Sequence, residues 1–251
     1  MSGHSKWASI KHKKAIVDSK RGKLFTKLAR AVTVAAKEGG GDIEGNPSLA
    51  LAVQKARDAS MPKDNIERAI AKGTGAGADT AALETIMYEG YGPGGVALLI
   101  EAVTDNRNRT GADVRHALSK GNGSLGEPGS VAYNFDKKGV IAVDGERYSE
   151  DDLMVAIDAG AEDISLDEDV YEIVTEPSDL TAVRAALEAA DIEIQNAEVI
   201  QRPKVLVPVD EETAAKLLRL IDTLEDNDDV DAVHANFDVD AEVLERLMAA
   251  S

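Results

Sequence analysis

The sequence predicts an α+β fold with three domains: an all-α N-terminal helical domain followed by two ferredoxin-like α/β lobes, one inserted in the other. Three observations lead to this prediction. The chain has 251 residues, which exceeds the roughly 100 to 150 residues typical of one domain. Hydrophobic residues recur at helical spacing up to residue 72, and the pattern alternates between strand and helix after residue 96. Residues 73–78, a run of small residues rich in glycine, read as a flexible linker between the two patterns.

The first predicted helix covers residues 20–38 and has two distinct faces. Its apolar residues gather on one side of a helical wheel: Leu24, Leu28, Ala31, Val32 and Ala35. Its cations line another side: Lys20, Lys23, Lys27, Arg30 and Lys37. Spacings of three and four residues make the second set a continuous basic face that can follow a phosphate backbone while the apolar side packs inward. Three glycines, residues 39–41, end this helix.

Two shorter helices are expected to complete the helical domain. Asn46 is suited to be the N-cap of the first of them, with Pro47 at the first helical position. The other runs near residues 65–72 and ends at Gly73.

The rest of the chain is predicted to form strand-helix-strand units. The expected strands are 96–104, 131–135, 139–143, 164–166, 170–175, 192–200, 204–209 and 231–237. The expected helices are 110–120, 150–159, 180–190 and 211–224. The middle two units form a tandem typical of the ferredoxin-like fold, which leaves the first and last units to pair with each other.

This pairing gives the predicted domain boundaries. Residues 1–78 form a basic all-α domain that binds nucleic acid. Residues 79–135 and 204–251 form a discontinuous α/β domain, and residues 136–203 form the α/β domain inserted in it.

Composition narrows the class of protein. With 43% hydrophobic and 29% charged residues and no apolar run of membrane-helix length, the chain is typical of a soluble globular protein and predicts no membrane partner. The polar, basic N-terminus does not resemble a secretory signal, so we expect a cytoplasmic location. The chain has no cysteine, which excludes disulfides, thiolate zinc sites and cysteine nucleophiles.

Charge is distributed very unevenly along the chain. The net charge is −18, yet residues 1–37 hold ten Lys and Arg against one acid, Asp18, for a local balance of +9. A short basic end beside an acidic body suggests that the end binds phosphate. The candidate nucleic-acid-binding residues of this end are Lys6, Lys11, Lys13, Lys14, Lys20, Arg21, Lys23, Lys27 and Arg30. The alternative is a soluble acidic protein with a solvated basic tail.

The segment from Thr104 to Thr110 adds two further candidates, Arg107 and Arg109. It lies between a predicted strand and a predicted helix, and helix N-termini attract anions while arginine binds phosphate in a bidentate fork. The alternative is that Asp105, Asn106 or Asn108 caps the helix while the two arginines pair with nearby acids.

No catalytic, cofactor or metal site is predicted. Two glycine-rich runs, residues 88–95 and 121–126, lack the phosphate-loop and dinucleotide-binding patterns and are explained by turns. The four histidines are scattered, and residues 225–231 share only acidity with a calcium loop, which favours a solvated acidic turn. We therefore expect a non-enzymatic protein without a cofactor.

Several motifs resemble those of the YebC family. They are Met1-Ser-Gly-His-Ser-Lys-Trp7, Lys11-His-Lys-Lys14, Tyr88-Glu-Gly-Tyr-Gly-Pro93, Thr104-Asp-Asn-Arg-Asn-Arg109 and Gly129-Ser-Val131, and their order and spacing extend through essentially the whole chain. The resemblance implies an all-α domain followed by two α/β domains. It also implies a regulator of transcription that binds DNA, while other members, including the mitochondrial translational activator of cytochrome c oxidase, act on translation at the ribosome. No cofactor or catalytic residue comes with the resemblance.

Two functions follow from these observations. The first is a monomeric, DNA-binding regulator of transcription that contacts the phosphate backbone through its basic N-terminal domain. The alternative is a translation factor that binds ribosomal RNA at the ribosome. The basic face of the first predicted helix consists mainly of lysine, which binds phosphate without reading bases, so low sequence specificity is expected. We also expect the basic domain to associate weakly with the acidic part of the chain when nucleic acid is absent.

Overall fold

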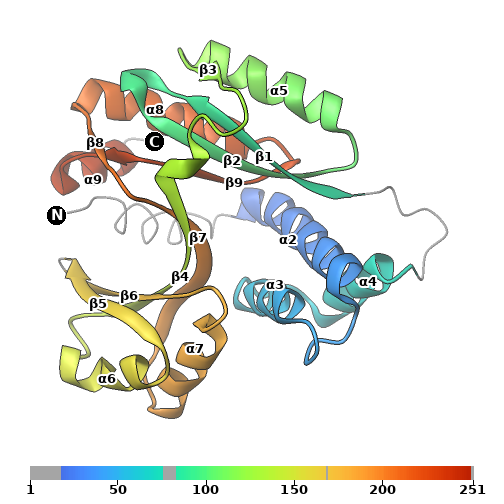
Figure 1. Cartoon of the computed structure of the whole chain (residues 1–251), viewed down its shortest axis with the longest axis vertical. Helices are drawn as coiled ribbons and strands as arrows, with labels where there is room; N and C mark the ends of the chain where they lie inside the picture. The colour runs from blue at the N-terminus through green and yellow to red at the C-terminus, as the bar shows by residue number, and fades with distance from the viewer. Residues whose placement is uncertain (1–17, 76–82, 168, 250–251) are drawn as a thin grey trace. The chain divides into compact units, whose positions relative to one another are not determined.

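The computed structural model describes residues 18–75, 83–167 and 169–249 (Figure 1). These residues form two compact units. The first, here called the helix–sheet unit, holds the described part of Ile16–Tyr133 together with Glu212–Ala235. The second, here called the ferredoxin-like unit, holds the described part of Asn134–Glu211 together with Asn236–Ser251. Helices and mainly antiparallel sheets occur in both, so the predicted α+β class is confirmed.

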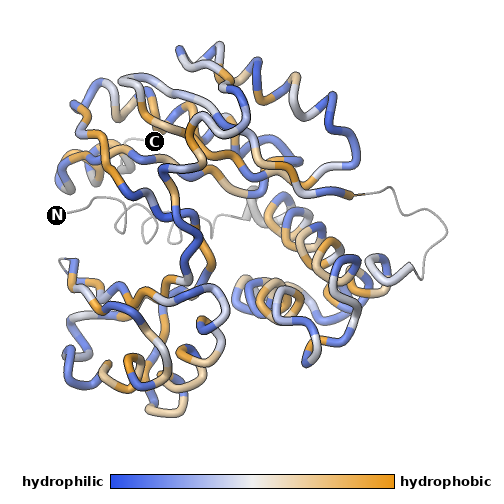
Figure 2. The backbone as a smooth tube through the Cα atoms, in the orientation of Figure 1, coloured by the Kyte–Doolittle hydropathy of each residue, from blue (hydrophilic) through white to orange (hydrophobic). Residues whose placement is uncertain are grey.

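Three helices make up the N-terminal part of the helix–sheet unit: α2 (Asp18–Gly39), α3 (Pro47–Asp58) and α4 (Lys63–Gly73). Their apolar faces meet in one core, in which Leu28, Val32, Leu49 and Val53 are almost fully buried. Figure 2 shows hydrophobic and hydrophilic residues alternating along these helices, as expected for helices that are buried on one side.

Asn46 and Gly73 fix how the three helices meet. As predicted, Asn46 caps α3 by accepting a hydrogen bond from the backbone N–H of Leu49 at 3.1 Å, with Pro47 in the first turn. Its amide also donates to the backbone oxygens of Ala35 and Gly40, both at 2.8 Å, which ties the start of α3 to the end of α2. A Cβ at Gly73 would lie 2.3 Å from the backbone oxygen of Thr33, so only glycine allows α4 to approach α2 this closely. The rest of the predicted linker, residues 76–78, lies outside the described residues.

A four-stranded antiparallel sheet forms the second part of this unit. Its strand order is β3 (Ser124–Leu125), β1 (Glu84–Tyr91), β2 (Ala97–Thr104) and β9 (Val230–Ala235). The pairing of β2 with β9 joins segments that are far apart in the chain, as expected from the pairing of the first and last predicted units.

Two helices, α5 (Arg107–Lys120) and α8 (Glu211–Glu225), lie along the same side of this sheet (Figure 1). A Cβ at Gly90 of β1 would lie 3.1 Å from Leu118 of α5, and one at Gly92 would lie 2.8 Å from Leu217 of α8. The glycine-rich segment after β1 is a tight turn that includes the short 3-10 helix η1 (Pro93–Gly95), in which Gly94 and Gly95 have φ of 75° and 74°. The prediction of a turn is confirmed at this position.

The ferredoxin-like unit has the topology that the middle tandem predicted. Its elements are β4 (Phe135–Asp144), α6 (Glu150–Asp158), β5 (Ala161–Asp167), β6 (Val170–Thr175), α7 (Leu180–Ala189) and β7 (Ile194–Pro203). The sheet has the order β5-β6-β4-β7, in which the first and third strands of the unit are central. Ile141 and Ile173 on these central strands are fully buried, together with Leu153 of α6 and Leu180 and Leu187 of α7. A short parallel pair, β8 (Val207–Pro208) and β10 (Phe237–Asp238), and helix α9 (Ala241–Ala249) complete the unit.

Three element predictions were wrong. The strand expected at residues 131–135 does not form before Phe135, which is the first residue of β4. Residues Ala132–Asn134 are the 3-10 helix η2, because the buried carboxylate of Glu89 accepts hydrogen bonds from the N–H groups of Gly129, Val131 and Ala132 at 2.6 to 2.8 Å. Strand β1 was missed because its sequence, with two glutamates, lacks a clear alternation, and it forms by pairing along its whole length with β2. The strand expected at residues 204–209 is reduced to the two residues of β8, because its partner strand β10 is equally short.

Candidate nucleic-acid interface

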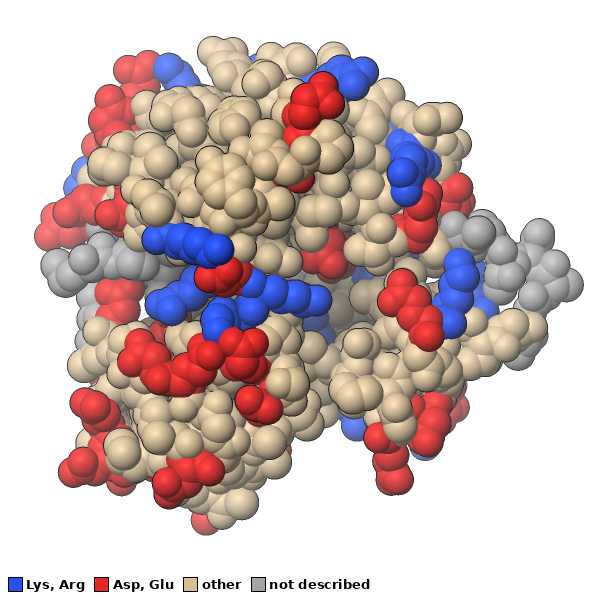
Figure 3. Space-filling model, viewed as in Figure 1, with Lys and Arg blue, Asp and Glu red and all other residues tan. Residues whose placement is uncertain are grey.

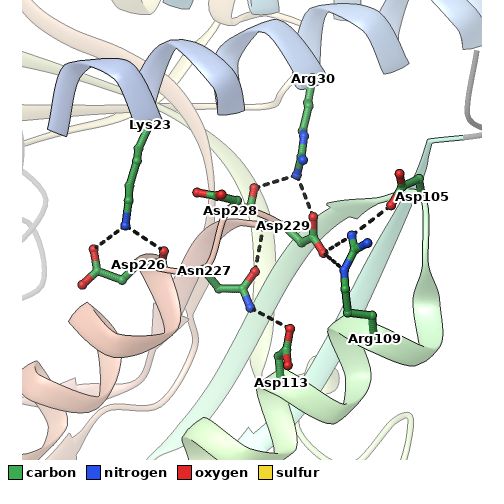
Figure 4. A pocket seen from close by; sticks show the side chains of 9 residues that line it. All are labelled: Lys23, Arg30, Asp105, Arg109, Asp113, Asp226, Asn227, Asp228 and Asp229. Atoms are coloured by element: carbon green, nitrogen blue, oxygen red, sulfur yellow. Dashed lines mark hydrogen bonds and ion pairs between the residues drawn. The ribbon is translucent and has the colours of Figure 1, made fainter.

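Three predicted phosphate-binding side chains, Lys23, Lys27 and Arg30, project from one face of α2. We call these three residues the basic stripe. Their spacing of four and three residues places them one above another on the helix. All three reach the same segment, residues 225–229, which we call the acidic turn; Figure 4 shows Lys23 and Arg30 extending from α2 toward it.

Each residue of the basic stripe binds oxygen atoms of the acidic turn. The ammonium group of Lys23 donates to the backbone oxygen of Asp226 at 3.2 Å and lies 3.6 Å from its carboxylate. Lys27 donates to the backbone oxygen of Glu225 at 2.5 Å. Arg30 donates to the backbone oxygen of Asp228 at 2.8 Å and to the carboxylate of Asp229 at 2.7 Å. The stripe therefore already binds a row of oxygen acceptors.

The position of the acidic turn explains why cations bind it. It begins at the last residue of α8, where backbone oxygens have no partner within the helix and the helix dipole is negative. Two backbone oxygens at this end, those of Glu225 and Asp226, are the ones that the lysines of the stripe reach. Asn227 shapes the turn by accepting a hydrogen bond from the N–H of Asp229 at 2.8 Å.

Asp229 is the buried centre of a polar network. Its side chain is only 6% exposed and accepts hydrogen bonds from Arg109 at 2.7 and 3.2 Å, from the hydroxyl of Thr110 at 2.8 Å and from Arg30. The hydroxyl of Thr104 adds a longer bond at 3.3 Å. Burial alone would raise the pKa of Asp229, but the bonds from Arg109, Thr110 and Arg30 outweigh it and hold the pKa below its ordinary value. The network fixes one end of the acidic turn to the start of α5.

Arg107 and Arg109 both pair with acids. Asn106 caps α5 by accepting a hydrogen bond from the N–H of Arg109 at 3.1 Å. Arg107 lies 2.7 Å from the carboxylate of Glu84, which lowers the pKa of Glu84, while Arg109 binds Asp229 and also Asp105 at 2.9 Å. Of the two interpretations open from the sequence, the geometry matches helix capping with ion pairing.

The remaining predicted residues are only partly placed. Lys6, Lys11, Lys13 and Lys14 lie outside the described residues. Lys20 and Arg21 belong to α2, but their side chains are outside the described part of the chain. Lys37, the last cation of the predicted basic face of α2, donates to the backbone oxygen of Leu83 at 3.0 Å.

Sequence reasoning missed the role of the acidic turn. The prediction of a solvated turn is wrong for Asp229, which is buried, although Asp226 and Asp228 are exposed. The signal present in the sequence was the charge pattern: a dense acidic run matches a dense basic stripe, and Thr104 and Thr110 flank the segment that holds Arg109. The recess between these groups is lined by the cations Lys23, Arg30 and Arg109 and by acids of both α5 and the turn (Figure 4).

The described residues were also compared with what a metal site and a membrane-spanning helix require. Within residues 18–75, 83–167 and 169–249, no group of three or more His, Asp or Glu side chains is arranged to hold a metal ion. Among the helices of these same ranges, none combines the length and the apolar character needed to cross a membrane.

Comparison with known proteins places this chain in a family. Residues 5–76 match the family model of the TACO1/YebC protein N-terminal domain, and residues 83–237 match that of the TACO1/YebC second and third domain. A protein of Rubrobacter xylanophilus named "Probable transcriptional regulatory protein" is 56% identical over 97% of this chain and 98% of its own length. A protein of Desulfotalea psychrophila with the same description is 55% identical over 98% of this chain and 99% of its own. The crystal structure of a conserved hypothetical protein from Aquifex aeolicus matches with a TM-score of 0.83 and 47% identity, covering 94% of this chain and 97% of that one.

Proposed function

Because the chain belongs to the TACO1/YebC family, we propose that it is a non-enzymatic, DNA-binding regulator of transcription that contacts the phosphate backbone through its basic N-terminal domain. Its relatives from Rubrobacter and Desulfotalea carry the name of transcriptional regulatory proteins, which supports regulation as the function. The basic stripe and the cations that precede it in the sequence supply the contact.

The observation that carries this proposal is the alignment of Lys23, Lys27 and Arg30 on α2. The first and last of them are seven positions apart in the chain, which corresponds to about 10 Å along the helix. Successive phosphates of one DNA strand advance by about 3.4 Å along the axis of the duplex, so this length corresponds to about three steps from one phosphate to the next. The three side chains already donate to a row of oxygen atoms, the kind of acceptor that a phosphate backbone presents.

The chemistry of the stripe favours positioning over base recognition. Two of its three members are lysines, which bind phosphate as point charges, whereas specific readout of guanine or adenine needs bidentate contacts in the major groove. The same property favours a second candidate function, binding of ribosomal RNA by a translation factor, because phosphates alone do not distinguish RNA from DNA. A preference for one of the two nucleic acids therefore has to come from shape or from other residues.

Binding of the triple variant Lys23→Gln, Lys27→Gln and Arg30→Gln tests the proposal. Its affinity for a short random-sequence DNA duplex at low salt should fall by about tenfold or more, because three phosphate contacts are lost. The matched control is Arg115→Gln, Lys120→Gln and Lys137→Gln, which removes the same charge from exposed positions outside α2.

The control should bind nearly as well as the parent, and circular dichroism should show that both variants are folded. Equal losses in the two variants would mean that net charge, and not the stripe, determines binding. A single-stranded RNA of the same length, titrated in parallel, decides between the candidates: tighter binding of the duplex supports the DNA-binding regulator, and tighter binding of RNA supports the translation factor.

A further inference from the structure

The acidic turn lies where the proposed nucleic-acid ligand has to bind. Every member of the basic stripe, Lys23, Lys27 and Arg30, is bonded to an oxygen of residues 225–229. A phosphate backbone that follows α2 would present its oxygens to the same three side chains. The turn and the ligand therefore compete for one surface.

We propose that the acidic turn is an intramolecular competitor of nucleic acid, which occupies the basic stripe in the free protein and is displaced from Lys23, Lys27 and Arg30 when phosphate binds. This inference rests on the proposed function. The acidic turn weakens the binding of isolated anions to the basic stripe, because the turn belongs to the same folded unit and is present at a high effective concentration. A ligand with several phosphates in a row replaces several turn oxygens at once, whereas a single anion replaces one.

The two ends of the contact differ in how easily they exchange. At the exposed end, the Lys23 and Asp226 side chains are 52% and 66% exposed, and ion pairs of this kind contribute little in water. At the buried end, Asp229 is held by Arg109 and Thr110 as well as by Arg30. Its backbone oxygen also accepts a hydrogen bond from Val103 of β2 at 2.7 Å. The exposed end can therefore open while the buried end keeps the turn in place.

The charge of Asp226 and Asp228 is the part of the competitor that can be removed without disturbing the network around Asp229. Both residues are exposed, and their replacement by asparagine preserves the shape of the turn and its backbone oxygens. The variant Asp226→Asn with Asp228→Asn thus weakens the competition and leaves the basic stripe intact.

The experiment measures binding of the full chain to a short random-sequence DNA duplex at low and at high salt. At low salt the double variant should bind about fivefold tighter than the parent, since the ion pair between Lys23 and Asp226 is lost and the turn beside the stripe carries one further negative charge less. The matched control is Asp158→Asn with Asp163→Asn, which removes two exposed negative charges from the ferredoxin-like unit. It should change affinity by less than about twofold, because these two carboxylates are not part of the acidic turn and so do not compete for the basic stripe.

The outcomes separate this inference from the proposed function. If the parent binds DNA and the two double variants bind equally tightly, the turn is no competitor, although the proposed function stands. If the advantage of the turn variant persists unchanged at high salt, it does not arise from charge competition, and the inference is overturned. If neither the parent nor the turn variant binds DNA or RNA, the proposed function fails, and the inference fails with it.

Discussion

Replacement of Asp229 by asparagine tests how the acidic turn is fixed to the sheet. The Asp229 carboxylate is 6% exposed and accepts charged hydrogen bonds from Arg109 and Arg30 and a neutral one from Thr110. Removing one partner of a fully buried ion pair costs about 3 to 5 kcal/mol. Here the side chains of Arg30 and Arg109 are 27% and 47% exposed and can be rehydrated, so we expect a loss of about 2 to 4 kcal/mol in the free energy of unfolding.

Urea unfolding followed by circular dichroism measures this loss, and Asp105→Asn is the matched control. Asp105 lies 2.9 Å from the same arginine, Arg109, but its side chain is 42% exposed. An exposed pair contributes about 0 to 1 kcal/mol, so the control should unfold nearly like the parent. If Asp229→Asn costs no more than the control, the buried network does not hold the turn and the reasoning is refuted.

Three further perturbations follow from the same structure. The pKa of Asp229 in the folded protein lies below its value of about 3.9 in the unfolded chain. The stability that the Asp229 carboxylate contributes is therefore present above about pH 3.9 and is lost as pH falls through the folded pKa. The variant Asp229→Asn should lose less free energy of unfolding in this acidic range than the parent does. Glu89→Gln weakens the acceptor for three backbone N–H groups and should cost about 1 to 3 kcal/mol in urea unfolding, while amide exchange at Val131 accelerates. Asn46→Ala removes the α3 cap and two bonds to α2, and should lower stability by about 1 to 3 kcal/mol, whereas Asn46→Ser, which keeps a capping oxygen, should lose less.

Local sequence signals predicted the helices well because each signal acts within a few residues. Asn46 and Pro47 mark the start of α3, and a run of glycines follows α2. The tandem that became the ferredoxin-like unit was also predictable, since its strands and helices alternate at regular intervals and its strands bury residues such as Ile141 and Ile173. In both cases the hydrophobic periodicity and the residues that end each element favour the same secondary structure.

Long-range contacts explain what the sequence did not predict. Residues 131–135 have the composition of a strand, but Glu89, about forty positions earlier, binds the N–H groups of Val131 and Ala132, and only Phe135 joins a strand. Strand β1 has weak alternation and depends on its register with β2. Neither interaction leaves a local trace in the sequence, because the partners are brought together only by the fold.

The candidate interface shows the same limit. The basic stripe follows directly from helical spacing, and the structure places Lys23, Lys27 and Arg30 on one face of α2 as expected. The partner of the stripe, the acidic turn, lies about two hundred residues away in the chain. Charge asymmetry predicted that the basic part would meet acidic residues, but only the pairing of β2 with β9 determines which acidic segment reaches α2.

The dependence of DNA affinity on salt tests the central claim most directly. If the basic stripe binds the phosphate backbone, the logarithm of the association constant of the parent should fall linearly with the logarithm of salt concentration, at about 0.9 per phosphate neutralised. The triple variant Lys23→Gln, Lys27→Gln and Arg30→Gln should then show a slope smaller by about 2 to 3, corresponding to three lost phosphate contacts. A triple variant with the slope and affinity of the parent would contradict the claim that this face of α2 binds nucleic acid.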